Sequence, residues 1–513
     1  MKRILPCLFA AMALSGPVCA ATFNVTRTDD PAPNGCAQND CSLREAVIDA
    51  NLTVQADVIM LPAGTYLIDF AGGNDTSAEI GDLDITSDIE FIGAPSIIDG
   101  QNVGRIMDIT GSADVTLRNL TLQNANSSLA TNNTLNGGAI EADGDSLRAF
   151  NVSFLGNSAQ GLGGAVRAFG DTLVEIDGCF FSDNHAGNGA GIHADTGVTV
   201  RDTVFEDNGA DVGALGSGAA AYLTGLTSDS LFERVRLERN TATGSGAAIY
   251  FLGRALVVEV LVATDNEAGG NGGVFLIPGT AHVKEVHIAN GRFSGNMADN
   301  GGAIGTSDDD DTFDFRHSSF VNNQATAGNG GALYVTGGMV DVANNTFSTN
   351  QATGNGGAMY QLGGDVNFHH NTVAGGVAGL GGALFIGGSA ATSAIELANN
   401  VFSGACQASD ADSVTSLGGN VESPGDSCDL DAGSDLVGQT SMQLGLQPLR
   451  FNYNATSTHE LLSGSVARGQ GEPAICIDVA VDQVFEDRDF CNSGAVESEL
   501  IFRDSVETSD FEL

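Results

Sequence analysis

Residues 320–338 read FVNNQATAGNGGALYVTGG, and this stretch contains a unit that repeats through the middle of the chain. Its first half is an apolar residue, then Asn three positions later and Ala two positions after that. Its second half is Gly-Gly-Ala, or a close variant, before another apolar residue. The first half starts at Phe154, Phe181, Phe205, Leu237, Ala263, Phe293, Phe320 and Phe347. The second half starts at Gly137, Gly163, Gly189, Gly218, Gly246, Gly272, Gly301, Gly330, Gly356 and Gly381, at intervals of roughly 25 to 29 residues that are typical of a solenoid.

The alternation of side chains within one unit predicts a short strand. Leu333 and Val335 are expected to face the core, and Tyr334 to face outward. Short apolar strands alternate with Gly, Asn and Asp turns along residues 52–403, so we expect an all-β chain folded as a right-handed parallel β-helix, a pectin-lyase-like solenoid.

Two kinds of side chain are expected to stack from coil to coil. The Phe of each unit should stack in the core, where aromatic rings bury a large apolar area. The Asn of each unit is predicted to lie at a turn in the left-handed conformation, with its amide bonding the next coil. A second such column is predicted for Asn345, Asn371 and Asn400.

The charge of the chain limits its partners. The formal net charge is −44 with an isoelectric point near 4.1, and lysine occurs only at Lys2 and Lys284. Such a surface repels phosphate backbones, which excludes nucleic acid, and it disfavours polyanionic polysaccharides. We interpret the acidity as a solubilising surface, with Ca²⁺ binding by some of these groups as the alternative.

The N-terminus has the pattern of a secretory signal peptide. Lys2 and Arg3 precede an apolar run, and Val18-Cys19-Ala20 predicts cleavage after Ala20. No later apolar run is long enough for a membrane span. Export permits disulfides. We hypothesise the local pairs Cys36–Cys41, Cys406–Cys428 and Cys476–Cys491, which leave Cys179 as a buried thiol.

Residues 21–51 are predicted to form an N-terminal cap over the open end of the solenoid, because an exposed sheet edge invites pairing with other chains. Ser42 opens a helix that runs to about Asn51, and Glu45 completes a capping box.

The cap carries a family resemblance. Residues 41–46 read CSLREA, and residues 57–66 then read DVIMLPAGTY. This order resembles the CSLREA-type entry segment of secreted bacterial β-helix proteins. The resemblance implies an exported, surface or extracellular β-helix and brings no catalytic residue with it.

Two further resemblances cover the rest of the chain. Across residues 120–405, the pairing of F-x-x-N with G-G-A-apolar resembles the repeats of chlamydial polymorphic outer membrane proteins, which implies a surface adhesin. Residues 458–465 (THELLSGS) and 491–497 (CNSGAVE) are similar to the closing segment of choice-of-anchor β-helix proteins. That similarity implies a C-terminal cap over 404–497, in which we expect a packing role for His459. Residues 498–513 form a short acidic tail, which we interpret either as the end of a released protein or as a sorting signal.

One outward column of side chains suggests a ligand. Outward aromatic rings repeating at the spacing of stacked coils, about 4.8 Å, match the advance of a glycan chain. They suggest a saccharide-binding track, and an aromatic ladder that only stabilises the sheet is the alternative. The residues are Tyr222, Tyr250, Tyr334, Tyr360 and Phe385.

The start of that column is polar. Glu141, Asp143, His193 and Asp195, with Arg167 between them, are expected to cluster on three consecutive coils. Paired carboxylates beside a base are the groups used in glycoside hydrolysis or lyase chemistry. The pectate lyase and polygalacturonase phrases are missing from the sequence.

A loop of four consecutive aspartates is the candidate Ca²⁺ site, because Ca²⁺ prefers oxygen ligands. A solvated charge run is the alternative. The residues are Asp308, Asp309, Asp310 and Asp311.

The sequence therefore favours a secreted or cell-surface binding protein, adhesin-like or glycan-binding, monomeric and without a required cofactor. The alternative is a hydrolase or lyase that acts on a neutral polysaccharide at Glu141, Asp143, His193 and Asp195.

Overall fold

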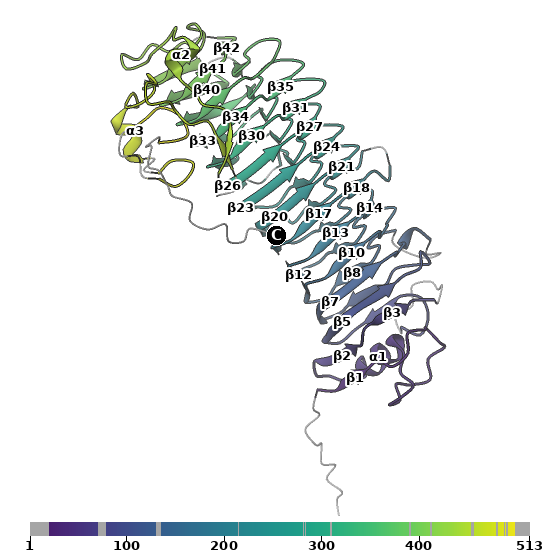
Figure 1. The fold of residues 1–513 in the computed structure, drawn as a ribbon. Helices are drawn as coiled ribbons and strands as arrows, with labels where there is room; N and C mark the ends of the chain where they lie inside the picture. Colours follow the sequence, from purple (N-terminus) through teal and green to yellow (C-terminus); the bar gives the residue numbers. More distant parts are fainter. Residues whose placement is uncertain are drawn as a thin grey trace, which may run out of the picture.

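The structure is a computed structural model that describes residues 20–69, 78–129, 135–213, 215–280, 282, 284–307, 310–388, 391–410, 413–452, 456–478, 481–486, 488 and 491–497. The expected signal peptide, apart from Ala20, and the expected acidic tail lie outside these residues. Figure 1 shows an elongated stack of strands, with helix α1 (Leu43–Ala50) at one end. Near the other end, α2 (Ser441–Leu444) and α3 (Pro473–Asp478) lie beside the last coils. The predicted parallel β-helix is confirmed.

One side of the β-helix is a 13-stranded parallel sheet built from the ten strands that follow the Gly-Gly-Ala phrases, from two earlier strands and from one later strand. Its members are β4 (Leu83–Ile85), β6 (Met107–Thr110), β8 (Ile140–Asp143), β11 (Val166–Ala168), β15 (Ile192–Ala194), β19 (Ala221–Leu223), β22 (Ile249–Phe251), β25 (Phe275–Ile277), β28 (Ile304–Thr306), β32 (Leu333–Val335), β36 (Met359–Gln361), β39 (Leu384–Ile386) and β42 (Gln407–Ala408).

A narrow second side is a 7-stranded parallel sheet that contains the Ala of the F-x-x-N-x-A phrase. It consists of β14 (His185–Ala186), β18 (Gly209–Ala210), β21 (Thr241–Ala242), β24 (Glu267–Ala268), β27 (Met297–Ala298), β31 (Gln324–Ala325) and β35 (Gln351–Ala352).

The remaining sides form one 24-stranded sheet with a corner, at which some strands run through and others break in two. Before or through the corner lie β1 (Thr22–Asn24), β2 (Asp57–Leu61), β5 (Ile89–Asp99), β7 (Asp114–Gln123), β9 (Ser146–Phe150), β12 (Leu173–Asp177), β16 (Val198–Arg201), β20 (Asp229–Glu238), β23 (Ala255–Thr264), β26 (Glu285–Ser294), β29 (Thr312–Arg316), β33 (Met339–Ala343), β37 (Gly364–His369), β40 (Ser393–Ala398) and β43 (Val414–Gly418). After it lie β3 (Gly64–Leu67), β10 (Ser153–Leu155), β13 (Phe180–Ser182), β17 (Val204–Glu206), β30 (Ser319–Val321), β34 (Thr346–Ser348), β38 (Thr372–Ala374), β41 (Val401–Ser403) and β44 (Val421–Ser423).

Short elements outside the three parallel sheets are the 3-10 helix η1 (Ser127–Leu129) and an antiparallel pair, β45 (Arg450–Phe451) with β46 (Ser457–Thr458). Parallel pairing in the large sheet continues past Ser403, because β41 pairs with β44 and β40 pairs with β43.

The core contains the predicted phenylalanine stacks. Phe154, Phe181 and Phe205 lie on consecutive coils with ring centroids 4.6 Å apart at each step. Phe293, Phe320 and Phe347 form a second stack, with centroids 4.7 and 4.8 Å apart. All six rings are fully buried, so the stacks contribute both apolar burial and ring contacts along the axis.

The asparagine of each unit forms a buried ladder, as predicted. Asn323 is fully buried, and its Nδ2 donates to the Phe293 carbonyl (3.0 Å) and to the Oδ1 of Asn350 (3.0 Å). Its own Oδ1 accepts from the backbone N–H (3.2 Å) and the Nδ2 (2.9 Å) of Asn296. The second column behaves in the same way: Asn345 bonds to Asn371, which bonds to Asn400.

The ladder asparagines are not the left-handed residues, and that part of the prediction was wrong. The residue before the ladder asparagine adopts the positive φ, as in Asn322 (55°) and Thr349 (56°). The left-handed residue turns the chain, with its side chain exposed at Asn322 and Thr349 but buried at Asn344 and His370 in the second column. In both columns the next residue turns its amide inward. One position cannot do both, because the inward amide needs an ordinary strand-like backbone.

The N-terminal helix is fastened by the CSLREA residues. Ser42 and Glu45 form the predicted capping box, and the Cys36–Cys41 disulfide lies beside it. Arg44 is fully buried and bonds both carboxylate oxygens of Asp30 at 2.7 and 2.8 Å. Its guanidinium also donates to the carbonyls of Ala78, Gly81 and Asp82, which belong to the first coil. The motif is therefore a structural link between cap and solenoid.

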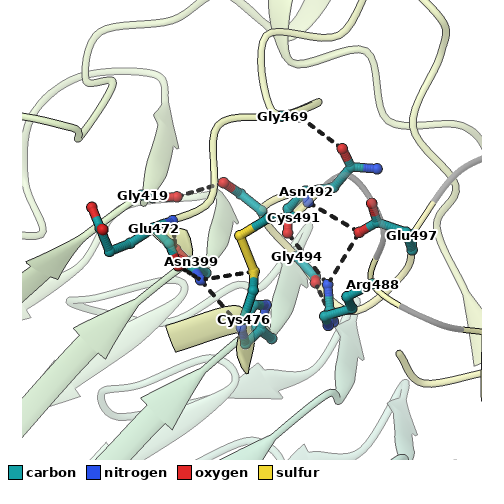
Figure 2. The surroundings of a disulfide bond; sticks show 12 residues. Asn399, Gly419, Gly469, Glu472, Cys476, Arg488, Cys491, Asn492, Gly494 and Glu497 are labelled. Atoms are coloured by element: carbon teal, nitrogen blue, oxygen red, sulfur yellow. Dashed lines mark hydrogen bonds and ion pairs between the residues drawn. A yellow bond between two sulfur atoms is a disulfide. The ribbon is translucent and has the colours of Figure 1, made fainter. Parts of the chain in front are cut away.

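The C-terminal segment does more than cover an end. The described residues between 456 and 497 lie along the corner of the large sheet, where they contact successive coils. Figure 2 shows this contact at the Cys476–Cys491 disulfide, beside Asn399 and the buried ion pair of Arg488 with Glu497 (3.7 Å). His459 bonds Ser348 (3.0 Å) and the Gln447 carbonyl (2.7 Å), in agreement with the packing role inferred for it.

The three hypothesised disulfides are confirmed. The remaining pair, Cys406–Cys428, closes the last coils, and Cys179 is a buried free thiol. Burial raises the pKa of the Cys179 thiol to about 12, so this thiol stays protonated and unreactive.

We predict that Asn323→Ala lowers the unfolding free energy by about 2 kcal/mol, because it removes the acceptor of the buried Asn296 backbone N–H and one hydrogen bond each from the Asn296 side-chain amide and the Phe293 carbonyl. Urea denaturation followed by circular dichroism measures this. The neighbouring Asn322→Gly is the control: Asn322 is exposed and left-handed, so the change should stay within about 0.5 kcal/mol. Equal effects of the two substitutions would contradict the ladder.

We predict that Arg44→Met releases the N-terminal cap, at a cost of about 3 to 5 kcal/mol, because Asp30 remains charged and buried. Limited proteolysis should then cut between the cap and the first coil. Arg27→Met is the matched control. Arg27 pairs with Asp29 and Asp40 at the surface, where solvent screens the attraction and such pairs contribute little to stability. If both variants resist protease as the wild type does, Arg44 does not hold the cap.

Candidate functional site

The column predicted from the position after Gly-Gly-Ala exists as one line across the 13-stranded sheet. Strand pairing places Tyr222 against Tyr250, and Tyr334 against Tyr360, which in turn pairs with Phe385. Leu276 and Gly305 occupy the two positions between Tyr250 and Tyr334. The column therefore holds two aromatic groups separated by two coils.

The rings of each group stack on one another. Ring centroids are 4.6 Å apart for Tyr222 and Tyr250, 5.6 Å for Tyr334 and Tyr360, and 5.3 Å for Tyr360 and Phe385. The inner ring faces are thus used within the ladder, and a ligand on this side would contact ring edges and hydroxyl groups. Burial raises the pKa of the tyrosine hydroxyls, that of Tyr222 to about 12, so they remain neutral hydrogen-bond donors.

A hollow of about 430 Å³ lies where the strands of the second aromatic group turn into the large sheet. Thr336 and Leu362 follow Tyr334 and Tyr360 by two positions, so they extend the same outward face. Leu362 is 43% exposed and Met339 is 57% exposed, which gives the hollow apolar walls. Its lining consists of Thr336, Gly338, Met339, Leu362, Gly363, Gly364, Asp365, Ala391 and Thr392.

The polar end of the column is divided into two groups. Arg167, His193 and Asp195 come together: Arg167 donates to Asp195 at 2.5 Å, and the His193 Nδ1 lies 3.8 Å from the Asp195 carboxylate. Glu141 is instead bound by Arg105. Asp143 is exposed at the end of β8. Of the four candidate catalytic residues, the structure therefore brings only His193 and Asp195 together.

His193 lacks the properties of a general base or acid near neutral pH. It is 3% exposed, and its ring stacks on Tyr222 with a centroid distance of 5.1 Å. Burial, with Arg167 beside it, lowers the pKa of His193 to about 3. The Nδ1 atom has no hydrogen-bond partner. The imidazole is consequently neutral over the physiological range, and it acts as an aromatic member of the stack.

Sequence reasoning missed the first part of this column. Strand pairing continues the line backwards from Glu141 to Asp108 and Asp84. Arg105 lies among these carboxylates, 3.1 Å from Asp82 and 3.2 Å from Asp108. Burial raises the pKa of Asp108 to about 6. These coils lack the Gly-Gly-Ala phrase, and the available signal was an acidic residue after Leu83 and Met107, as after Ile140.

The acidic loop is only partly described, since Asp308 and Asp309 lie outside the described residues. Asp311 is fully buried, and its carboxylate bonds the Lys284 ammonium at 3.0 Å rather than facing a solvent-filled loop. Among the residues that the structure describes, no three His, Cys, Asp or Glu side chains are grouped so as to bind a metal ion.

Comparison with known proteins supports the repeat resemblance. A family model described as the Chlamydia polymorphic membrane protein repeat matches residues 151–168 and 317–336. Each segment contains the phenylalanine–asparagine phrase followed by Gly-Gly-Ala. No curated protein and no solved structure matches the chain.

The chain is a β-helix whose repeats resemble those of polymorphic membrane proteins, and this combination fits a surface protein. Within the described part of the chain, none of the helices has the length and apolar character needed to span a bilayer.

The burial of His193 predicts a pH effect with a definite sign. Its folded pKa, about 3, lies below the ordinary value of 6.5, so its contribution to stability is complete above pH 6.5 and is lost as the pH falls toward 3. His193→Phe keeps a ring on Tyr222 and removes the titration. Between pH 7 and pH 4.5, wild type should lose about 2 to 3 kcal/mol more stability than the variant.

Urea denaturation of both proteins at the two pH values measures this difference. The comparison of wild type with variant cancels the contribution of Asp108 to the pH dependence of stability, which has the opposite sign. Because the pKa of Asp108 is raised, its stabilising contribution is present below about pH 4 and is lost as the pH rises through about 6. Parallel pH profiles of wild type and variant would show that His193 is not buried in a neutral form.

Proposed function

We propose that the protein is an exported surface or extracellular binding protein whose ligand is a neutral glycan on a cell or polymer surface. The observation that carries the proposal is the hollow beside the second aromatic group, where tyrosine hydroxyls and exposed apolar side chains share one face. Ligand sites combine apolar walls with a few polar groups in volumes of roughly 300 to 1,000 Å³. The match to the polymorphic membrane protein repeat adds support, because that repeat type is associated with surface proteins.

The chemistry of this face suits a neutral saccharide. Leu362 and Met339 offer apolar contact to the carbon–hydrogen faces of a sugar ring. Thr336 and Thr392 line the hollow, and Tyr334 and Tyr360 belong to strands β32 and β36 beside it; the hydroxyl groups of both pairs can hydrogen-bond to sugar hydroxyls. Asp365 and the overall charge of −44 disfavour uronates and sulfated sugars.

The alternative raised by the sequence, a hydrolase or lyase at the polar end of the column, is not favoured by any observation. Glu141 is engaged by Arg105, and Asp195 is engaged by Arg167 and by Thr224 at 2.6 Å. His193 stays neutral and buried. Binding without turnover therefore accounts better for the outward face.

A glycan array with the purified protein tests the proposal, with neutral and acidic glycans side by side. Tyr334→Phe/Tyr360→Phe keeps the stack and removes two hydroxyls, so affinity for a bound neutral glycan should fall about tenfold or more. Tyr222→Phe/Tyr250→Phe is the matched control in the other aromatic group and should bind as wild type does. Absence of neutral-glycan binding by wild type, or equal loss in both variants, would contradict a site at the hollow.

A further inference from the structure

Lys284 forms an ion pair that differs from the other buried ion pairs of the described chain. Its side chain and that of Asp311 are both 0% exposed, with Nζ 3.0 Å from Oδ2. Arg44, Arg105 and Arg488 supply the cation in the other nearly buried pairs. Arginine suits such pairs because its fork satisfies a carboxylate at two points, whereas a buried lysine can lose its proton and act as a nucleophile.

The Asp311 carboxylate is held by a second donor. The Lys284 backbone N–H donates to Oδ1 at 2.8 Å, while the Lys284 ammonium donates to Oδ2. One residue therefore binds both oxygens and keeps the carboxyl carbon beside its own amine. The two residues lie on neighbouring coils, 27 positions apart, just before β26 and β29, and strand pairing fixes the separation of their backbones.

From this geometry we propose that Lys284 and Asp311 condense to an intramolecular isopeptide bond. A proton moves from Nζ to Oδ2, and the neutral amine attacks Cγ. The negative charge then develops on Oδ1, which already accepts the Lys284 backbone N–H. The Cγ–Oδ2 bond breaks, and Oδ2 leaves as water with two of the three ammonium protons. Ammonium plus carboxylate gives amide plus water, so no co-reactant is needed.

Burial and placement both favour the condensation. A fully buried ion pair keeps a desolvation penalty for each of its ions, whereas an amide is neutral. Holding the two groups in contact also replaces a bimolecular encounter by a step within one molecule.

The position suits a covalent link between coils. The three disulfides of the described chain lie in its first part, at Cys36–Cys41, and in its last part, from Cys406 onward. In the described coils between these two parts, the one cysteine is Cys179, which has a free thiol. An amide between Lys284 and Asp311 would tie two central coils together, and reductants would not cleave it.

Intact-mass measurement of the purified wild-type chain tests the proposal. The mass should be lower than that of the disulfide-bonded sequence by one water, and protease digestion should release a branched peptide that joins Lys284 to Asp311. In denaturant, acetic anhydride should leave the Lys284 side chain unmodified. A mass without the water loss, together with complete acetylation of Lys284, would mean that the two residues form an ion pair only.

Lys284→Arg is the matched control, because it retains the charge pair but cannot condense. It should show the full sequence mass and no branched peptide, and a water loss that persists in this variant would place the link elsewhere and overturn the assignment. The wild-type measurements decide the matter even if the variant folds poorly. They are also independent of glycan binding, so the failure of one proposal leaves the other standing.

Discussion

Buried asparagine side chains fix how one coil of this protein sits on the next. Each ladder amide donates to a backbone carbonyl of the coil before it and to the amide oxygen of the coil after it, as at Asn323. These groups are sealed from water, so a coil that shifted by one residue would leave several polar atoms unsatisfied. The two ladders therefore set the register of the parallel strands over the coils between Asn157 and Asn420, where side chains at equivalent positions must stack.

The aromatic features follow from that register. Phe293, Phe320 and Phe347 occupy one position in successive repeats and stack with nearly constant spacing inside the core. On the outer face the same register places Tyr334, Tyr360 and Phe385 at equivalent positions, where they form a ladder. One repeated constraint thus supplies both the stability of the core and a regular surface. The hollow at the end of the second aromatic group is the point where the regular surface offers a concave, mixed apolar and polar site.

In this strongly acidic chain, a small number of cationic side chains form ion pairs with nearby carboxylates. Arg105 lies among Asp82, Asp108 and Glu141, and Arg167 holds Asp195. Burial raises the pKa of Asp108 to about 6; the neighbouring carboxylates add to this rise, and the Arg105 guanidinium opposes it. The polar end of the column is accordingly a set of satisfied ion pairs, whereas the aromatic end keeps hydroxyl groups and apolar edges available to a partner.

The sequence by itself determined the periodic features: the β-helix, the inward Phe320 and outward Tyr334, and the two asparagine ladders. Each of these depends on spacing within one repeat or between neighbouring repeats, which the chain displays directly. The disulfides lie outside the repeats, and the sequence suggested them through the short separations of three cysteine pairs. Only the tertiary structure decided which neighbour captures a given charge. Arg105 forms an ion pair with Glu141, and Lys284 forms one with Asp311. The described residues between 456 and 497 lie along the corner of the large sheet. It also decided that the residue before each ladder asparagine adopts the left-handed turn. The physical reason is that the repeat period specifies which residues form a column of side chains. The length and burial of each side chain determine which residues it pairs with, within that column and beside it.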